Sequence, residues 1–96
     1  MPKAILIFHK KIVYPDGDLL EMKAWAVPKV PRTPQGVKYS LVYINAEGER
    51  VLGYDNAEGK GHHRHEGSKE TEIDFESIET LADQFLKEVE ASRRKQ

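Results

Sequence analysis

The 96-residue chain contains no cysteine. Disulfide bonds, thiolate metal ligands and a cysteine nucleophile are therefore excluded from its chemistry. The absence suits a reducing compartment, and we expect a cytoplasmic protein. Long apolar runs are also missing, because none reaches the roughly 18 residues of a membrane-spanning helix. Residues 1–10 lack the pattern of a signal peptide, and we expect no contact with a membrane.

A strong excess of one charge is missing as well. Fifteen Lys and Arg residues against sixteen Asp and Glu residues give a net charge of −1. The distribution is uneven, because residues 1–66 hold ten basic and eight acidic residues, whereas residues 67–96 hold five and eight. A strongly basic domain would have indicated a nucleic-acid-binding protein. Here any contact with nucleic acid has to be local, or has to be made beside a basic partner.

Apolar residues are nonetheless frequent enough for a folded core. Hydrophobic residues make up 39% of the chain and charged residues 32%, which is typical of a globular protein and excludes a disordered one. A chain of this length buries roughly two-thirds of the surface that it exposes when unfolded, so it can build one modest core. We expect residues 1–96 to form a single domain.

The alternation of apolar and turn-forming residues predicts four or five strands. β-Branched and aromatic residues dominate the first of them, and the unbroken apolar run from Ala4 to Phe8 is typical of a central strand covered on both faces. A Pro-Asp-Gly-Asp turn separates this strand from the second. The strands are expected at residues 3–14, 19–27, 37–44, 50–55 and 71–75, with the last at an edge of the sheet.

The strongest periodic pattern lies near the C-terminus. Ser77 is a suitable N-cap, and Arg93 lies near the negative end of the helix dipole. We expect a helix at residues 77–92, packed across a mostly antiparallel sheet, which gives an α+β fold. Six apolar residues with helical spacing would face that sheet, namely Ile78, Leu81, Ala82, Phe85, Leu86 and Val89.

The residues suited to chemistry gather between Leu52 and His65. Tyr54 and Asp55 come at the end of an expected strand, and glycines follow them. This pattern predicts a strand end followed by a flexible loop that carries titratable and phosphate-binding groups. The expected loop holds three of the four histidines of the chain, at His62, His63 and His65.

Each residue type in this segment suggests a role. We expect His63 and His65 to serve as general base and general acid, because imidazole changes charge near neutral pH. Arg64 offers a planar fork for phosphate oxygens or a developing oxyanion, and Tyr54 could position the substrate or donate a proton. Backbone N–H groups of the glycines could turn toward a phosphate, while a lysine adds charge. The residues expected to bind substrate are Asp55, Gly59, Lys60, Gly61 and His62.

Two other interpretations of the segment remain open. A structural one is a solvated hairpin loop, in which Asp55 and its neighbour close a turn through their own backbone. The other is a divalent metal site made by His62 or His63 with His65, completed by Asp55 or Glu66. The spacing matches no closed structural zinc site, so we expect neither a metal nor another cofactor.

The segment from Gly53 to His65 resembles the signature of the TumE-type toxins of prokaryotic toxin–antitoxin systems. Those short proteins carry Tyr-Asp-Asn and then Gly-Lys-Gly-x-His-Arg-His after a strand, and an amphipathic C-terminal helix follows. The resemblance implies a cytosolic toxin that is neutralised by a small antitoxin encoded beside it, usually a helix-turn-helix DNA-binding protein. The matched positions are Tyr54, Asp55, Lys60, His63, Arg64 and His65.

The residues and the resemblance together favour a toxin that acts on RNA, free or on the ribosome, as a metal-independent ribonuclease. Such cleavage needs a base for the 2′-hydroxyl, an acid for the 5′-oxygen and cations for the phosphate, and the segment holds all three. Two other classes remain open at this point. One is a non-catalytic module that binds a partner protein, and the other is a metal-dependent enzyme of unknown substrate.

Overall fold

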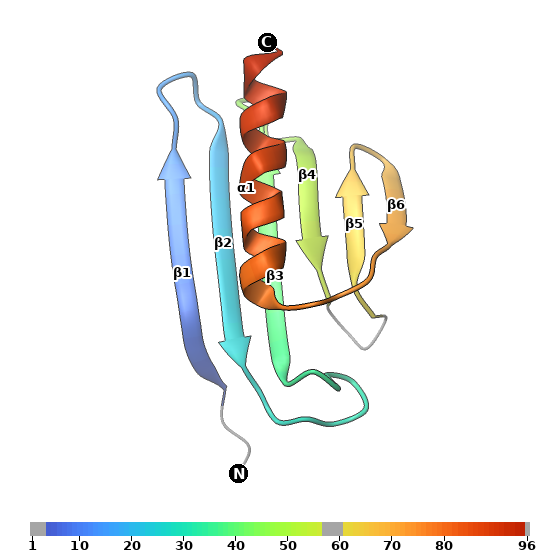
Figure 1. Cartoon of the computed structure of the whole chain (residues 1–96). Helices are drawn as coiled ribbons and strands as arrows, with labels where there is room; N and C mark the ends of the chain where they lie inside the picture. The colour runs from blue at the N-terminus through green and yellow to red at the C-terminus, as the bar shows by residue number, and fades with distance from the viewer. Residues whose placement is uncertain (1–3, 57–60, 96) are drawn as a thin grey trace.

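In the part of the chain that the structure describes, one helix lies against one face of a six-stranded antiparallel sheet (Figure 1). The computed structural model describes residues 4–56 and 61–95. The strands lie in the sheet in the order in which they occur in the chain, so every connection joins neighbours. The elements are β1 (Ile5–Val13), β2 (Leu19–Ala26), β3 (Val37–Ile44), β4 (Arg50–Asp55), β5 (His63–Glu66), β6 (Lys69–Glu72) and α1 (Ile78–Arg94).

The expected α+β fold is confirmed, but the expected number of four or five strands is wrong. The additional strand is β5, and β6 begins two residues earlier than the edge strand expected at residues 71–75. Their sequences, His-Arg-His-Glu and Lys-Glu-Thr-Glu, lack the apolar alternation by which a strand is recognised. They form strands because β5 continues the backbone ladder of β4, and β6 continues that of β5.

The position of β1 also differs from the prediction. Its apolar run indicated a central strand covered on both faces, whereas β1 lies at the outer edge of the sheet and, among the described strands, pairs with β2 alone (Figure 1). Phe8 and Ile12 pack against the core, but the other residues of β1 are exposed. An apolar run indicates that the side chains of a strand are covered, but it does not indicate whether the covering surface belongs to the same chain.

The face of the sheet that packs against α1 holds the core. Along β3 the side chains alternate strictly, and Val37, Tyr39, Leu41 and Tyr43 are buried. The helix lies over β3 and β4 and buries four residues against them, namely Ile78, Leu81, Phe85 and Val89. No helix among the described residues covers the opposite face, which is called the open face below.

The predicted helix is confirmed and extends two residues beyond the expected end. Ser77 is its N-cap, and the Ser77 hydroxyl accepts a hydrogen bond of 3.1 Å from the backbone N–H of Thr80. Arg93 and Arg94 lie in the last turn, where cations favour the negative end of the helix dipole. No helix in the described part of the chain is long and apolar enough to span a membrane.

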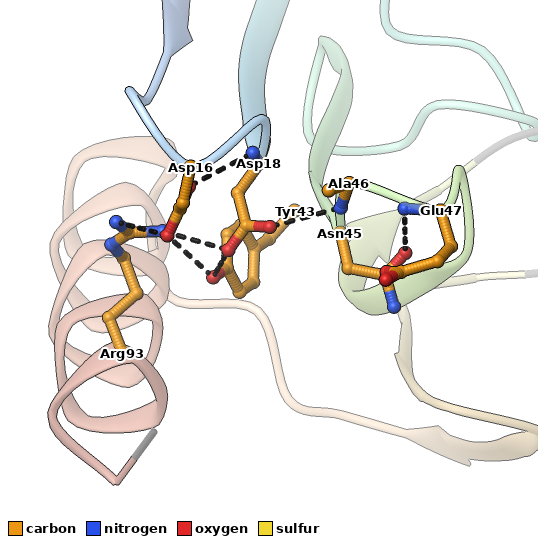
Figure 2. A network of polar contacts seen from close by, with 7 residues as sticks. All are labelled: Asp16, Asp18, Tyr43, Asn45, Ala46, Glu47 and Arg93. Atoms are coloured by element: carbon orange, nitrogen blue, oxygen red, sulfur yellow. Dashed lines mark hydrogen bonds and ion pairs between the residues drawn. The ribbon is translucent and has the colours of Figure 1, made fainter.

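A partly buried polar network fixes the C-terminal end of α1 to the turn between β1 and β2 (Figure 2). The Tyr43 hydroxyl donates to Asp18 Oδ2 at 2.5 Å, and Arg93 Nη1 donates to the same oxygen at 2.8 Å. A second Arg93 nitrogen donates to Asp16 at 3.0 Å, and the guanidinium lies 3.6 Å from the centre of the Tyr14 ring. The backbone N–H of Asp18 and the Arg93 side chain hold the pKa of Asp16 below its usual range. This end of the helix is therefore anchored by charge as well as by packing.

Candidate functional site

The histidines expected in a loop lie in a strand. His63, Arg64 and His65 belong to β5 and pair with β4 in the register Asp55 with His63, Tyr54 with Arg64 and Gly53 with His65. The prediction of a flexible histidine loop is therefore wrong for these three residues. The reason is that backbone pairing with β4 does not depend on side-chain polarity, so a polar segment can extend a sheet. The expected substrate-binding residues Gly59 and Lys60 lie outside the described residues.

Strand geometry divides the segment between the two faces of the sheet. Neighbouring residues of a strand point to opposite faces, so Arg64 faces away from His63 and His65. Arg64 contacts Glu88 of α1 and therefore lies on the helix side, while the two histidines lie on the open face. The structure thus brings His63 and His65 together with Asp55, and it separates them from Tyr54 and Arg64.

Tyr54 and Arg64 belong to a polar cluster that ties the β4–β5 hairpin to the helix. The buried Tyr54 hydroxyl donates to Glu88 Oε1 at 2.5 Å and accepts a hydrogen bond of 3.0 Å from Gln84 Nε2. Burial and the bond to Glu88 raise the pKa of Tyr54 to about 12. Burial tends to lower the pKa of Arg64, but hydrogen bonds to Glu66 and Glu88 outweigh it and raise that pKa above its usual range. Both side chains therefore hold the helix in place in their ordinary protonation states.

His62 lies on the helix side as well, in an aromatic stack. Its ring is nearly parallel to that of Phe75, with centroids 4.3 Å apart, and Nδ1 lies 2.9 Å from the Tyr39 hydroxyl. Nε2 lies 3.1 Å from Gln35 Oε1. Burial, and to a lesser extent the neighbouring His63, lowers the pKa of His62 below its ordinary value. The folded protein therefore favours the neutral imidazole at this position.

This shift makes His62 a pH-sensitive element of stability. The unfolded chain binds a proton at His62 more readily than the folded chain, so the free energy of unfolding falls as the pH drops below 6.5. We expect the melting temperature of the wild-type protein to fall between about pH 7.5 and 5.5. His62→Gln should show a smaller fall over the same range. Equal pH dependence of the two melting temperatures would contradict this assignment.

Gly61 and His62, both expected to bind substrate, line a small pocket. Gly61 has a φ of +80°, which favours glycine, and it turns the chain into β5. The pocket has a volume of 180 Å³, and Arg32 gives it a positive charge. Its other lining residues are Pro31, Pro34, Gln35 and Asn56. This pocket is distinct from the face that carries His63 and His65.

The open face carries two histidines that each lie beside a carboxylate. His65 Nε2 is 3.2 Å from Asp55 Oδ2, and His63 Nδ1 is 3.2 Å from Glu70 Oε2. Both imidazoles are largely enclosed, with 13% of the His63 side chain and 14% of the His65 side chain exposed. A carboxylate beside an imidazole orients the ring and fixes its tautomer, which is the arrangement that acid–base catalysis uses.

Asp55 and His63 belong to a polar row that crosses the whole sheet. The row begins on β1 and ends on β6, with one residue from each strand paired with the next. Its members lie opposite one another on the open face because their neighbours on β2 and β3 are buried on the helix side. The row consists of His9, Lys23, Ser40, Asp55, His63 and Glu72.

A comparison with protein families settles the affiliation of the chain. The family model described as Toxin TumE matches residues 2–93. The chain belongs to the TumE toxin family. A search of curated proteins and a search of solved structures each found no match. The resemblance seen in the Gly53–His65 segment is thus confirmed, and it extends over nearly the entire chain.

Asn56 is a residue of the TumE segment whose role could not be assigned from the sequence. Its side chain accepts a hydrogen bond of 3.0 Å from the Tyr39 N–H and donates one of 2.8 Å to the Val37 carbonyl. The Asn56 side chain therefore takes the place of a backbone hydrogen-bond partner for β3, directly after the last residue of β4. The only sequence signal is its position directly after the strand, where an amide side chain often replaces a ladder bond.

The structure gives no support to the metal-site interpretation of this TumE family member. Within residues 4–56 and 61–95, no group of three or more His, Cys, Asp or Glu residues is placed to hold a metal ion. His62 stacks on Phe75 on the helix side, so it does not converge with His63 and His65. Each of the two open-face histidines lies beside a different carboxylate.

Proposed function

We propose that the chain is the toxin of a prokaryotic toxin–antitoxin system and acts on RNA as a metal-independent ribonuclease. The observation that supports this proposal is the pair of carboxylate-linked histidines, His63 and His65, on one open sheet face. The toxin family supplies the biological class, and the histidine pair supplies the chemistry. The substrate is RNA, free or on the ribosome, because its 2′-hydroxyl provides the internal nucleophile that two histidines can activate.

The proposed reaction needs one imidazole in each protonation state. One histidine takes the proton of the 2′-hydroxyl as the oxygen attacks the adjacent phosphorus. The other gives a proton to the departing 5′-oxygen, so the products are a 2′,3′-cyclic phosphate and a free 5′-hydroxyl. Asp55 holds His65 through Nε2, which leaves Nδ1 of that ring for proton transfer. No electron transfer or cofactor enters this step.

The charge for the phosphate comes from cations on the open face rather than from Arg64. Arg64 is held on the helix side by Glu66 and Glu88, so it does not face the histidines. On the open face, Lys23 lies in the same cross-strand row as His63, and Lys38 lies two residues before Ser40 along β3. Arg50 of β4 also lies on this face, because its side chain covers Gly53, which pairs with His65.

The arrangement of charge also favours one path for the RNA across the sheet. Glu70 and Glu72 lie on the β6 side of the histidines and repel phosphate groups. Trp25 lies on the β2 side, opposite Lys38, and its half-buried ring is suited to stacking on a base. We therefore propose that the RNA leaves the histidines toward β3 and β2, over Lys38 and Trp25.

The toxin family implies an antitoxin partner. We propose that this partner is a small helix-turn-helix protein encoded beside the toxin. Induced expression of the chain alone is expected to arrest the growth of a bacterial host, and co-expression of the neighbouring reading frame is expected to restore it. Colony counts after induction, together with the amount of soluble protein, provide the measurement.

Unchanged growth at a high level of soluble protein would reject the toxin assignment for this chain. Growth arrest without any RNA cleavage would keep the toxin but reject the ribonuclease. In that case the open face would act as a protein-interaction module, and its histidines would be binding groups. RNA extracted before and after induction, with the 5′ ends mapped, separates these outcomes.

A further inference from the structure

The outer strand β1 presents a long apolar edge. Of the six large hydrophobic residues that are exposed in the described part of the chain, four lie on β1. Ile5 and Val13, at its two ends, are 67% and 68% exposed, and Leu6 and Ile7 are also exposed. A sheet edge exposes unpaired backbone N–H and C=O groups, so this strand offers both hydrogen bonds and apolar side chains to another strand.

The opposite edge of the sheet is protected in the usual way. β6 has four residues, of which three are charged, and its sequence is Lys-Glu-Thr-Glu. Short, charged edge strands resist pairing with other chains. β1 has nine residues and carries its apolar residues at both ends, so only its middle is charged. The difference between the two edges indicates that β1 is built to be covered.

The charge in the middle of β1 selects the kind of strand that covers it. His9, Lys10 and Lys11 are consecutive and exposed, and within the described residues neither lysine forms an ion pair. Antiparallel pairing of two copies of β1 about Lys10 would place the two Lys10 side chains opposite each other and each Lys11 opposite a His9. Like charges opposite one another destabilise a strand pair, so a second copy is disfavoured in this register. An acidic strand would be attracted to the same positions.

From these observations we infer that β1 binds an extended segment of a partner protein as a seventh strand. The segment has acidic residues opposite Lys10 and Lys11 and apolar residues opposite the two ends of β1. Backbone hydrogen bonds would provide most of the affinity, and the charge pattern would provide the specificity. This inference rests on the proposed function in one respect only, which is that the antitoxin is the expected carrier of the segment.

The test uses the whole chain and a synthetic peptide, N-acetylated and C-amidated, with the sequence Val-Thr-Val-Glu-Asp-Glu-Val-Thr-Val. Calorimetry is expected to show binding, and hydrogen exchange should show new protection of β1 amides while β6 amides are unaffected. A control peptide with Lys-Ser-Lys in place of Glu-Asp-Glu should bind at least about tenfold more weakly. The double variant Lys10→Glu/Lys11→Glu should reverse the preference between the two peptides.

Matched variants on other exposed positions show whether the effect belongs to β1. Leu6→Lys should abolish peptide binding, whereas Val30→Lys, at an exposed apolar residue outside β1, should leave it unchanged. Lys69→Glu on β6 should also leave it unchanged. Absence of binding at about 1 mM peptide would overturn the inference, because a strand that fits should bind more tightly than that. Equal affinity for the two peptides would overturn it as well.

The oligomeric state gives a further decisive outcome. Sedimentation is expected to show a monomer, and a dimer whose β1 amides are protected without peptide would identify a second copy as the occupant and overturn the inference. The combination His63→Asn/His65→Gln should bind the peptide like the wild type. A wild-type protein that binds the peptide but does not arrest growth would count against the proposed function alone, and one that arrests growth but does not bind the peptide would count against the β1 inference alone.

Discussion

His63→Asn and His65→Gln are each expected to reduce RNA cleavage by about 100-fold or more and to abolish growth arrest. The two replacements are chosen from the geometry of each pair. Asparagine at position 63 places an amide near the position of Nδ1, which faces Glu70, and glutamine at position 65 places one near Nε2, which faces Asp55. The contact with the carboxylate is retained in each case, while proton transfer is lost.

The matched control for these variants is His9→Gln. His9 lies in the same cross-strand row and also contacts a carboxylate, with Nε2 2.8 Å from Glu21 Oε2. It is more exposed than His63 and His65 and lies three strands away from β4. We expect His9→Gln to retain toxicity. If all three histidine variants arrest growth as the wild type does, the open-face histidines take no part in catalysis.

Three further measurements separate catalysis from other roles. Cleavage should persist in EDTA, and its rate should pass through a maximum with pH, because one histidine has to be neutral and the other protonated. Melting temperatures of the variants should stay close to that of the wild type, since the carboxylate contacts are retained. Loss of activity on chelation, restored by zinc or manganese, would transfer the same residues to a metal-dependent reaction.

The helix could be predicted from the sequence with nearly correct limits. Its apolar residues repeat with a 3.6-residue period, and the N-cap Ser77 marks its start. Leu81, Phe85 and Val89 are buried against the sheet, as that period predicts. Local spacing was sufficient here because the partner surface needs only to be apolar, whatever its identity.

The candidate site could not be predicted to the same extent. The residues were identified by type, but their division between two faces depends on β5 being a strand, which its polar sequence does not indicate. Once β5 pairs with β4, alternation alone sends Arg64 to Glu88 and leaves His63 and His65 on the open face. The missing information was a long-range pairing, and local propensity does not encode it.

The edge position of β1 could not be predicted from local sequence either. The sequence Ile-Leu-Ile-Phe correctly predicted a strand, and it predicted neighbours on both faces that the chain itself does not supply. In a folded domain the apolar pattern of a strand usually agrees with the position of that strand in the fold. Where the two disagree, as in β1, a functional surface is expected. The disagreement is therefore informative, and it is the basis for the proposed seventh strand.

Phe85→Ala is expected to lower the free energy of unfolding by about 3–5 kcal/mol. Phe85 is fully buried, and its ring packs edge-on against Tyr54 with centroids 5.9 Å apart. Removing the ring leaves a cavity between α1 and β4 that the surrounding side chains can fill only in part. A domain of this size has a total stability of roughly 5–14 kcal/mol, so the loss is at least about a fifth of it. Chemical denaturation of both proteins measures the difference.

The neighbouring residue provides the control, because Leu86 is 37% exposed on the same helix. Leu86→Ala should cost less than about 1 kcal/mol, since part of the Leu86 side chain already contacts water in the folded protein. Below its melting temperature, the Phe85→Ala protein should still cleave RNA, because Phe85 lies on the helix side and the histidines lie on the open face. A loss of stability under about 0.5 kcal/mol for both Phe85→Ala and Leu81→Ala would show that the helix does not pack on β3 and β4. Loss of cleavage by a folded Phe85→Ala protein would instead place the active residues among those that contact the helix, with Tyr54 and Arg64 as the first to be tested.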